Sequence, residues 1–322
     1  MPLRFIEKKP RRRDCAADAY RIFIMFGICL LHASGSVCGH ESWWLSNSLY
    51  WCVPGFVFIS GFYRVHFSMK KIAKLYWIAA YITGIVSIVK LLLGDAWGLV
   101  DAIKLFRSYW FLNAYVVLAM MAPALNILVD EQRLKECILL IAISFGWGFL
   151  GTVPYVSYFV PKFTGMGSYS PLMMMGAYLV GRIYGQYELE EYLLRRKKLL
   201  FLAVVVSLGL SILGLCEYTS PFGLVIALAV FAGFRRSGIA EVLGRRMYVI
   251  VPSLFSIYLF HSRSEFGLAL MSQAEDLLCS HNWPMLLVYF VTACTAFSLG
   301  LVVDVPRRFF EWLIAQEYKR LV

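Results

Sequence analysis

The first apolar segment of the chain reads Asp18-Ala-Tyr-Arg21-Ile-Phe-Ile-Met-Phe-Gly-Ile-Cys-Leu-Leu-His32. The ten residues between Arg21 and His32 carry no charge, and the segment extends over about residues 19–36, long enough for a membrane-spanning helix. The whole chain has the same character, because 60% of its 322 residues are hydrophobic and 16% are charged. A soluble protein has about 45–50% apolar and about 25% charged residues. The composition therefore indicates a polytopic membrane protein and excludes a disordered, collagen-like or disulfide-rich secreted chain.

Ten segments of about 20 mainly apolar residues follow one another along the chain. They lie at about residues 19–36, 49–66, 72–93, 109–128, 136–153, 168–186, 198–216, 220–234, 247–266 and 284–303. They leave about 120 residues for tails and connections, too few for a separate soluble domain. We therefore expect an all-α fold, a transmembrane helical bundle of about ten spans over residues 19–310, between cytoplasmic tails at 1–18 and 311–322.

The basic residues indicate which side of the membrane each connection faces. Of the 31 lysines and arginines, 25 fall in the two tails and in every second connection, and four fall in the connections between them. Cytoplasmic connections carry the excess of Lys and Arg, so we expect both termini in the cytoplasm. A signal peptide could also begin with a basic stretch and an apolar run, but no small-residue cleavage site follows, and we expect a retained first helix.

Charge and cysteine content exclude two further kinds of partner. The net charge of +11 comes from short basic clusters between apolar segments, so we expect no nucleic-acid partner. The eight cysteines show no Cys-x-x-Cys spacing, and we expect no metal site. Cys38 and Cys52 both fall near the outer face and could form a disulfide, although free cysteines in apolar segments are the simpler interpretation.

Ionisable side chains inside a bilayer are costly, which makes those within the spans candidates for function. Arg21 and His32 are eleven residues apart, and at about 100° per residue they share one face of a helix, about 16 Å apart along its axis. Arg21 could instead extend to the lipid headgroups, and His32 could make an ordinary hydrogen bond between helices. We favour a functional role for His32, because its imidazole exchanges protons near neutral pH.

Four residues near the outer face are candidates for binding a substrate. They are Trp110 and Asn113 at the start of the fourth span, and Tyr258 and His261 in the ninth. Trp and Tyr at this depth also form aromatic belts that need no ligand. His261 could be a second catalytic imidazole, a substrate ligand or an interfacial residue.

Three lysines below the second and third spans could bind phosphate groups. Lys71 and Lys74 lie one helical turn apart, with Lys70 beside them. Lysine ammonium groups bind phosphate oxygens, as in many nucleotide sites. Most cytoplasmic clusters of this kind only determine topology.

These residues together resemble the membrane acyltransferase family 3, bacterial integral-membrane enzymes that acylate O-antigens, exopolysaccharides and similar glycans. The resemblance rests on Asp18-x-x-Arg21 with ten residues before His32, Trp51-Cys-Val-Pro54-Gly-Phe-Val-Phe-Ile-Ser60-Gly61-Phe, Trp110-Phe-Leu with Ala122-Pro123 and Asn126, Gly176-Ala-Tyr-Leu-Val-Gly181, and Tyr258-Leu-Phe-His261. It covers residues from about 14 to about 310. It implies that His32 is essential for acyl transfer and that Arg21 supports it.

The chain departs from the family in two places. Many members carry an Arg-x-x-Arg pair after the second helix, proposed to handle acyl-CoA, where this chain has Lys71-Ile-Ala-Lys74. Lysine keeps the charge but not the bidentate geometry of arginine. Some members add an extracytoplasmic hydrolase-like domain, which we do not expect here, so the chain would act directly or with a separate extracytoplasmic transferase.

The resemblance predicts a multi-pass enzyme of the cell membrane that uses acyl-CoA, with acetyl-CoA the first choice, to acylate a hydroxyl of a surface glycan or its lipid-linked precursor. His32 would act as general base or accept the acyl group itself. Arg21 would orient the donor or stabilise negative charge, and Asp18 would fix Arg21.

Three other functions would also place polar groups in membrane helices. A transporter or flippase for a polysaccharide precursor predicts broken helices in two matching halves, and no such pairing is evident. A polysaccharide polymerase predicts a long outer loop, whereas the longest here covers only about residues 262–283. An intramembrane protease could pair Ser60 with His261, on the weak signal of one Ser-Gly.

Overall fold

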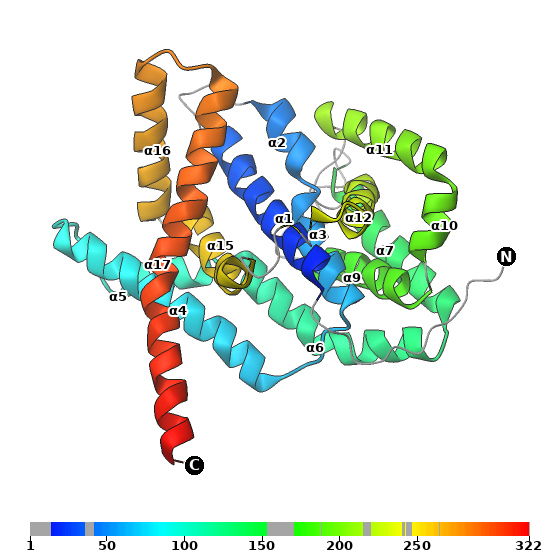
Figure 1. The fold of residues 1–322 in the computed structure, drawn as a ribbon, viewed down its shortest axis with the longest axis horizontal. Helices are drawn as coiled ribbons and strands as arrows, with labels where there is room; N and C mark the ends of the chain where they lie inside the picture. The colour runs from blue at the N-terminus through cyan, green and yellow to red at the C-terminus, as the bar shows by residue number, and fades with distance from the viewer. Residues whose placement is uncertain are drawn as a thin grey trace. The chain divides into compact units, whose positions relative to one another are not determined.

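The computed structural model describes residues 14–35, 42–152, 171–187, 189–214, 220–239, 242, 247–263 and 265–321. These residues form helices and no strand, as expected for an all-α fold (Figure 1). The helices are α1 (Cys15–Ser34), α2 (Trp43–Leu49), α3 (Cys52–Phe62), α4 (Met69–Leu92), α5 (Leu99–Arg107), α6 (Trp110–Asp130), α7 (Leu134–Thr152), α9 (Pro171–Gln186), α10 (Leu189–Arg195), α11 (Lys197–Ile212), α12 (Pro221–Arg236), α14 (Met247–Ile250), η3 (Val251–Ser253), α15 (Leu254–Arg263), α16 (Glu265–Ser280) and α17 (Met285–Leu321).

Each of the ten expected apolar segments coincides with a helix, the ninth with α14, η3 and α15 in succession. Four described helices are long and apolar enough to cross a membrane: α1, α4, α6 and residues Met285–Gln316 of α17. The α4 helix exposes Trp77, Leu91 and Leu92, apolar side chains suited to contact lipid. The structure therefore supports a membrane protein built from helices.

The chain divides into two compact units. The first unit comprises Met1–Ile24, Ser42–Met69 and Trp110–Gly244, and the second comprises Met25–Glu41, Lys70–Tyr109 and Arg245–Val322. The first unit thus holds the beginning of α1 with α2, α3, α6, α7 and α9 to α12. The second holds the end of α1 with α4, α5 and α14 to α17.

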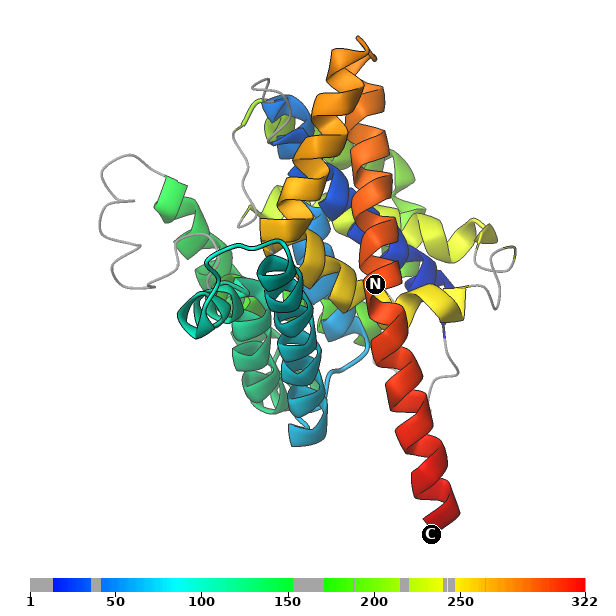
Figure 2. The same ribbon diagram turned by 90° about the vertical axis from the view of Figure 1, so that its left-hand side faces the viewer.

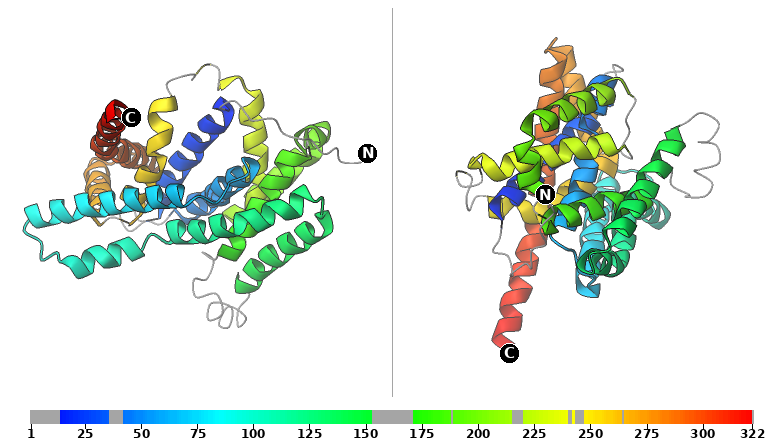
Figure 3. Two further views of the ribbon diagram at one scale, coloured as in Figure 1. Left: turned by 90° about the horizontal axis from the view of Figure 1, so that it is seen from below. Right: turned by 90° about the vertical axis from the view of Figure 1, so that its right-hand side faces the viewer.

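The core of the first unit is the contact between α3 and α9, with α7 packed beside α9 (Figure 3). Glycines bring the two backbones together, because a Cβ built on Gly61 would overlap the carbonyl oxygen of Tyr178, and one built on Gly181 would overlap that of Phe58. Small residues at such crossings let membrane helices approach closely. Gly61 and Gly181, both within the segments that carry the family resemblance, thus have a structural role.

A polar network closes one end of this helix pair. The side-chain oxygen of Asn126 accepts hydrogen bonds from the Tyr178 hydroxyl (2.9 Å) and from Nε of Arg182 (3.2 Å). Arg182, only 1% exposed, also pairs with Asp130, which binds Arg64 as well. A buried guanidinium is tolerated only when it is paired and hydrogen-bonded, and Asn126 and Asp130 provide those partners for Arg182.

The helices of the second unit extend beyond the expected spans in two places. The predicted outer loop at about 262–283 contains α16, which packs along the first part of α17 (Figure 2). The last helix does not end near 303, because α17 continues through Pro306 to Leu321 and includes the residues expected to form a tail. Its 37 residues span about 55 Å, more than the hydrocarbon core of a bilayer.

The cysteines distinguish the two interpretations that the sequence left open for Cys52. Cys52 is a buried free thiol, so the considered disulfide between Cys38 and Cys52 is wrong, and Cys38 lies outside the described residues. Cys15, Cys29, Cys137 and Cys294 are also free, as the simpler interpretation predicted for apolar segments. Cys279, at the end of α16, is disulfide-bonded.

Glu275 on α16 makes the stability of the second unit depend on pH. The residue is 2% exposed, and burial together with the neighbouring Asp276 raises its pKa from 4.5 to about 7. The folded protein therefore retains this proton where the unfolded chain has lost it. We expect the free energy of unfolding to fall by about 2–3 kcal/mol as the pH rises from about 4.5 to about 7, and the contribution of this group to level off about one pH unit higher.

Thermal unfolding in detergent at a series of pH values tests this expectation. Replacing Glu275 by Gln should remove most of the decrease in unfolding temperature between these pH values. An unchanged pH dependence in Glu275→Gln would assign the effect to other groups.

Candidate active site

The helix α1, which carries Asp18 and Arg21, begins with an N-cap residue. The Asp14 side chain accepts hydrogen bonds from the backbone N–H groups of Ala16 (3.1 Å) and Ala17 (3.2 Å), which an N-cap residue provides. The helix then runs without a break to Ser34, so Arg21 and His32 have the helical spacing that the sequence predicted. Asp18 lies in the first turn, where a negative charge is favourable.

Arg21 is held within the first unit by two side chains. Its guanidinium pairs with Asp18 at 3.0 Å, and Asp18 is only 2% exposed. The guanidinium carbon also lies 5.0 Å from the centre of the Tyr63 ring, at cation–π distance. Asp18 and Arg21 thus form an ion pair, and 28% of the Arg21 side chain is exposed.

Two hydroxyl groups lie in the same part of the first unit. Tyr115 is hydrogen-bonded to Ser60 and within electrostatic range of Arg21. The Ser60 hydroxyl also donates to the carbonyl oxygen of Phe56 at 3.0 Å. A serine that donates its proton to the backbone is a poor nucleophile, so this geometry does not favour Ser60 as a protease residue.

In the second unit the end of α1 and the helix α15 bring two histidines together. The ring centres of His32 and His261 lie 5.3 Å apart, with the planes inclined at 64°. His261 is fully buried, and the Tyr258 ring lies 6.5 Å from it. Tyr258 and His261 were predicted as substrate-binding residues, and the structure places His261 directly beside His32.

The hydrogen bond of His261 determines which ring nitrogen can accept a proton. Its Nδ1 lies 2.6 Å from the carbonyl oxygen of Ile257, and because a carbonyl only accepts, Nδ1 must donate. In the neutral ring Nε2 then carries the lone pair. This Nε2 is buried and has no hydrogen-bond partner within the described residues. It is therefore available as a base or hydrogen-bond acceptor.

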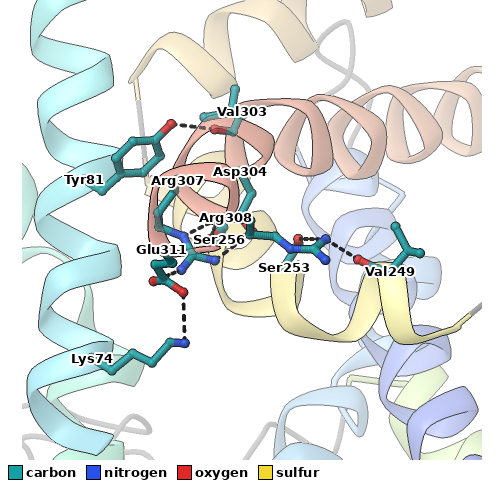
Figure 4. A network of polar contacts seen from close by, with 10 residues as sticks. All are labelled: Lys74, Tyr81, Val249, Ser253, Ser256, Val303, Asp304, Arg307, Arg308 and Glu311. Atoms are coloured by element: carbon teal, nitrogen blue, oxygen red, sulfur yellow. Dashed lines mark hydrogen bonds and ion pairs between the residues drawn. The ribbon is translucent and has the colours of Figure 1, made fainter. Parts of the chain in front are cut away.

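The three lysines lie on the first turns of α4, also in the second unit. Lys70 and Lys71 are exposed and have no carboxylate partner among the residues that the structure describes. Lys74 pairs with Glu311 of α17 at 3.1 Å (Figure 4). Two positive charges thus remain available to an anion, and a third is bound by an acidic side chain.

The remaining predicted residues, Trp110 and Asn113, lie on α6 in the first unit, where both are half-buried. Trp110 packs against the ring of Phe111 at 5.6 Å. Their predicted role in substrate binding stays a prediction. No three His, Cys, Asp or Glu side chains are grouped to hold a metal ion within the described part of the chain.

One protein family matches most of the chain. A family model described as an acyltransferase domain, Acyl_transf_3, matches residues 16–304. The chain belongs to acyltransferase family 3. The match begins at the first turn of α1 and ends at Asp304, so it includes every candidate site residue that the sequence of this acyltransferase predicted. No curated protein and no solved structure shows significant similarity to it.

The sequence of this membrane acyltransferase did not indicate four side chains that lie around the candidate residues. Tyr63 and Tyr115 lie near Arg21. Glu311 pairs with Lys74, and Asp304 lies buried in the same network on α17 (Figure 4). No short motif marks these residues, because each contacts residues from distant parts of the chain.

Proposed function

We propose that this membrane acyltransferase transfers an acyl group, acetyl in the first instance, from cytoplasmic acyl-CoA to a hydroxyl of a cell-surface glycan or its lipid-linked precursor. The observation that carries this proposal is the contact between His32 and His261, with the lone pair of His261 Nε2 available. Acyl transfer to a hydroxyl needs a base, and an imidazole with a free lone pair provides one.

The transfer has two possible routes through the histidine pair. In the first, an imidazole nitrogen takes the proton of the glycan hydroxyl, the oxygen attacks the thioester carbonyl carbon, and the carbon–sulfur bond breaks to release CoA. In the second, a nitrogen of His32 attacks the thioester carbonyl carbon, the carbon–sulfur bond breaks, and CoA leaves as the thiol with the proton of the imidazole. The glycan hydroxyl then takes the acyl group from His32, and its proton returns to the imidazole. In both routes His261 would support His32 as a neighbouring proton acceptor, through the lone pair on its Nε2.

Four basic residues would serve the donor. Lys70 and Lys71, exposed on α4, would bind the phosphates of acyl-CoA, with Lys74 joining them when Glu311 releases it. Arg21, oriented by Asp18, would bind the donor or stabilise the negative charge that develops on the carbonyl oxygen. The enzyme would work in the cell membrane with both termini in the cytoplasm, directly or with a separate extracytoplasmic transferase.

Mass spectrometry of the surface glycan tests the proposed function. Cells with the protein should carry acyl groups, expected as acetyl, on a glycan that is unmodified in cells without it. A glycan that disappears from the surface without the protein, with no change in acylation of what remains, would instead indicate a transporter or flippase.

Glu311 is expected to weaken donor binding. Replacing it by Gln removes the negative charge that holds Lys74, so the KM for acetyl-CoA should fall about two- to fivefold, within the range of an exposed ion pair. The measurement is the initial rate of acetyl transfer against acetyl-CoA concentration in membranes. Glu136→Gln on α7, which breaks the exposed pair of Glu136 with Arg133, is the control and should leave KM unchanged. An unchanged or raised KM in Glu311→Gln would contradict a role of Lys74 in binding the donor.

A further inference from the structure

The helix that carries His261 is joined to α17 by a buried hydrogen bond. The Ser256 hydroxyl of α15 donates to Asp304 of α17, and both residues are fully buried (Figure 4). Ser256 precedes His261 by five residues on the same helix. The hydrogen bond therefore holds α15 against α17 at a point close to the His261 imidazole.

A second contact joins the same two helices at the next residue. A Cβ on Gly300 of α17 would lie 2.7 Å from the Cα of Ile257, so only glycine lets the backbones approach this closely. Ile257 is also the residue whose carbonyl oxygen binds Nδ1 of His261. The residue that α17 contacts thus orients the imidazole.

Asp304 is itself held in place by an arginine on its own helix. Nε of Arg307 donates to Oδ1 of Asp304 at 2.6 Å, and Nη2 donates to Oδ2 at 2.9 Å. Arg307 is 2% exposed and also binds Glu311. This bidentate pairing compensates the buried carboxylate charge and leaves Asp304 a rigid acceptor for Ser256.

We propose that Ser256 and Asp304 are positioning residues for His261: the bond between them, with the contact of Gly300 and Ile257, sets the place of the imidazole beside His32. This proposal rests on the proposed function, because it assigns His261 a part in acyl transfer. A displacement of about 1 Å at a reacting group can cost about a hundredfold in rate, so a small shift of α15 acts on the chemical step.

Ser256→Ala is the sharpest test, because it removes the bond to α15 and leaves the pair of Asp304 and Arg307 intact. The kcat for acetyl transfer should fall about tenfold or more, while the KM for acetyl-CoA stays within about twofold of wild type. The pH at which kcat is half-maximal should also move, because the environment of the imidazole changes with its position. Both constants are measured on purified, monodisperse protein in detergent.

Tyr81→Phe provides the matched control. The Tyr81 hydroxyl of α4 donates to the carbonyl oxygen of Val303 at 2.9 Å, so its loss also removes one hydrogen bond to α17, at the residue before Asp304, without touching α15. It should leave kcat, KM and the pH profile unchanged. If Ser256→Ala does not fold, Ser256→Cys, which nearly keeps the volume and weakens the hydrogen bond, takes its place in the same comparison.

The outcomes separate the two proposals. The Ser256 variant could match Tyr81→Phe in both kcat and pH profile while His261→Ala is inactive. This result would overturn the positioning role and leave the proposed function standing. Full activity of His261→Ala would instead remove His261 from the proposed mechanism. A tenfold loss in Ser256→Ala with an unmoved pH profile would identify a purely structural bond and also overturn the positioning role.

Discussion

Replacing His32 by Ala is expected to reduce acetyl transfer by about a thousandfold, because a general base contributes about a hundredfold to ten-thousandfold to a rate and a nucleophile at least as much. The structure adds a reason for the large effect. His32 contacts His261, so its removal takes away one imidazole and the packing partner of the other. The rate of label transfer from acetyl-CoA to glycan in membranes measures the loss.

His281→Ala is the matched control for this variant. The Nδ1 of His281 lies 2.8 Å from the carbonyl oxygen of Leu277, the same backbone contact that His261 makes, but His281 is exposed after α16. Its loss should leave the rate within about twofold of wild type, as for a surface substitution. Equal activity of the His32 and His281 variants, at equal amounts of inserted protein, would refute the catalytic role of His32.

Gly181→Ala should strongly destabilise the first unit. The added Cβ would overlap the carbonyl oxygen of Phe58, and backbone cannot move aside as a side chain can. The helices α3 and α9 would have to separate, and the reciprocal contact of Gly61 with Tyr178 would be lost with them. We expect a loss of more than about 3 kcal/mol in the free energy of unfolding, at the upper end for overpacked cores. The fraction of monodisperse protein and its unfolding temperature in detergent measure it.

Gly233→Ala on α12 distinguishes crowding from a general effect of alanine. Nothing lies within 4 Å of a Cβ at this position, so the substitution should leave the unfolding temperature unchanged or raise it through better helix propensity. If Gly181→Ala melted at the same temperature as Gly233→Ala, the close approach of α3 and α9 would be wrong.

Apolar periodicity located the helices well and their ends poorly. The segment from Arg21 to His32 predicted α1 and the common helical face of the two ionisable residues at its ends. The basic residues after 303 instead predicted a tail, although α17 continues to Leu321. Arg307 is compensated inside the helix by Asp304 and Glu311, three and four residues away, so its charge does not end the helix.

The sequence predicted a site residue only where its residue type is rare in that setting or its partner lies close by in the sequence. A histidine in an apolar helix is rare enough to stand out, and the ion pair of Asp18 with Arg21 follows from their spacing of three residues. The bond of Ser256 with Asp304 joins residues 48 positions apart, and that of Lys74 with Glu311 joins residues 237 apart. No local pattern encodes such pairs, because they depend on which helices pack together.

Release of CoA by the purified protein in liposomes tests the central claim most directly. Supplied with acetyl-CoA and a glycan lipid acceptor, the wild-type protein should release one free CoA thiol for each acetyl group that appears on the glycan. The His32→Ala and His261→Ala variants should release almost none. Movement of the glycan lipid across the bilayer without thiol release, or equal release by all three proteins, would contradict acyl transfer by the histidine pair.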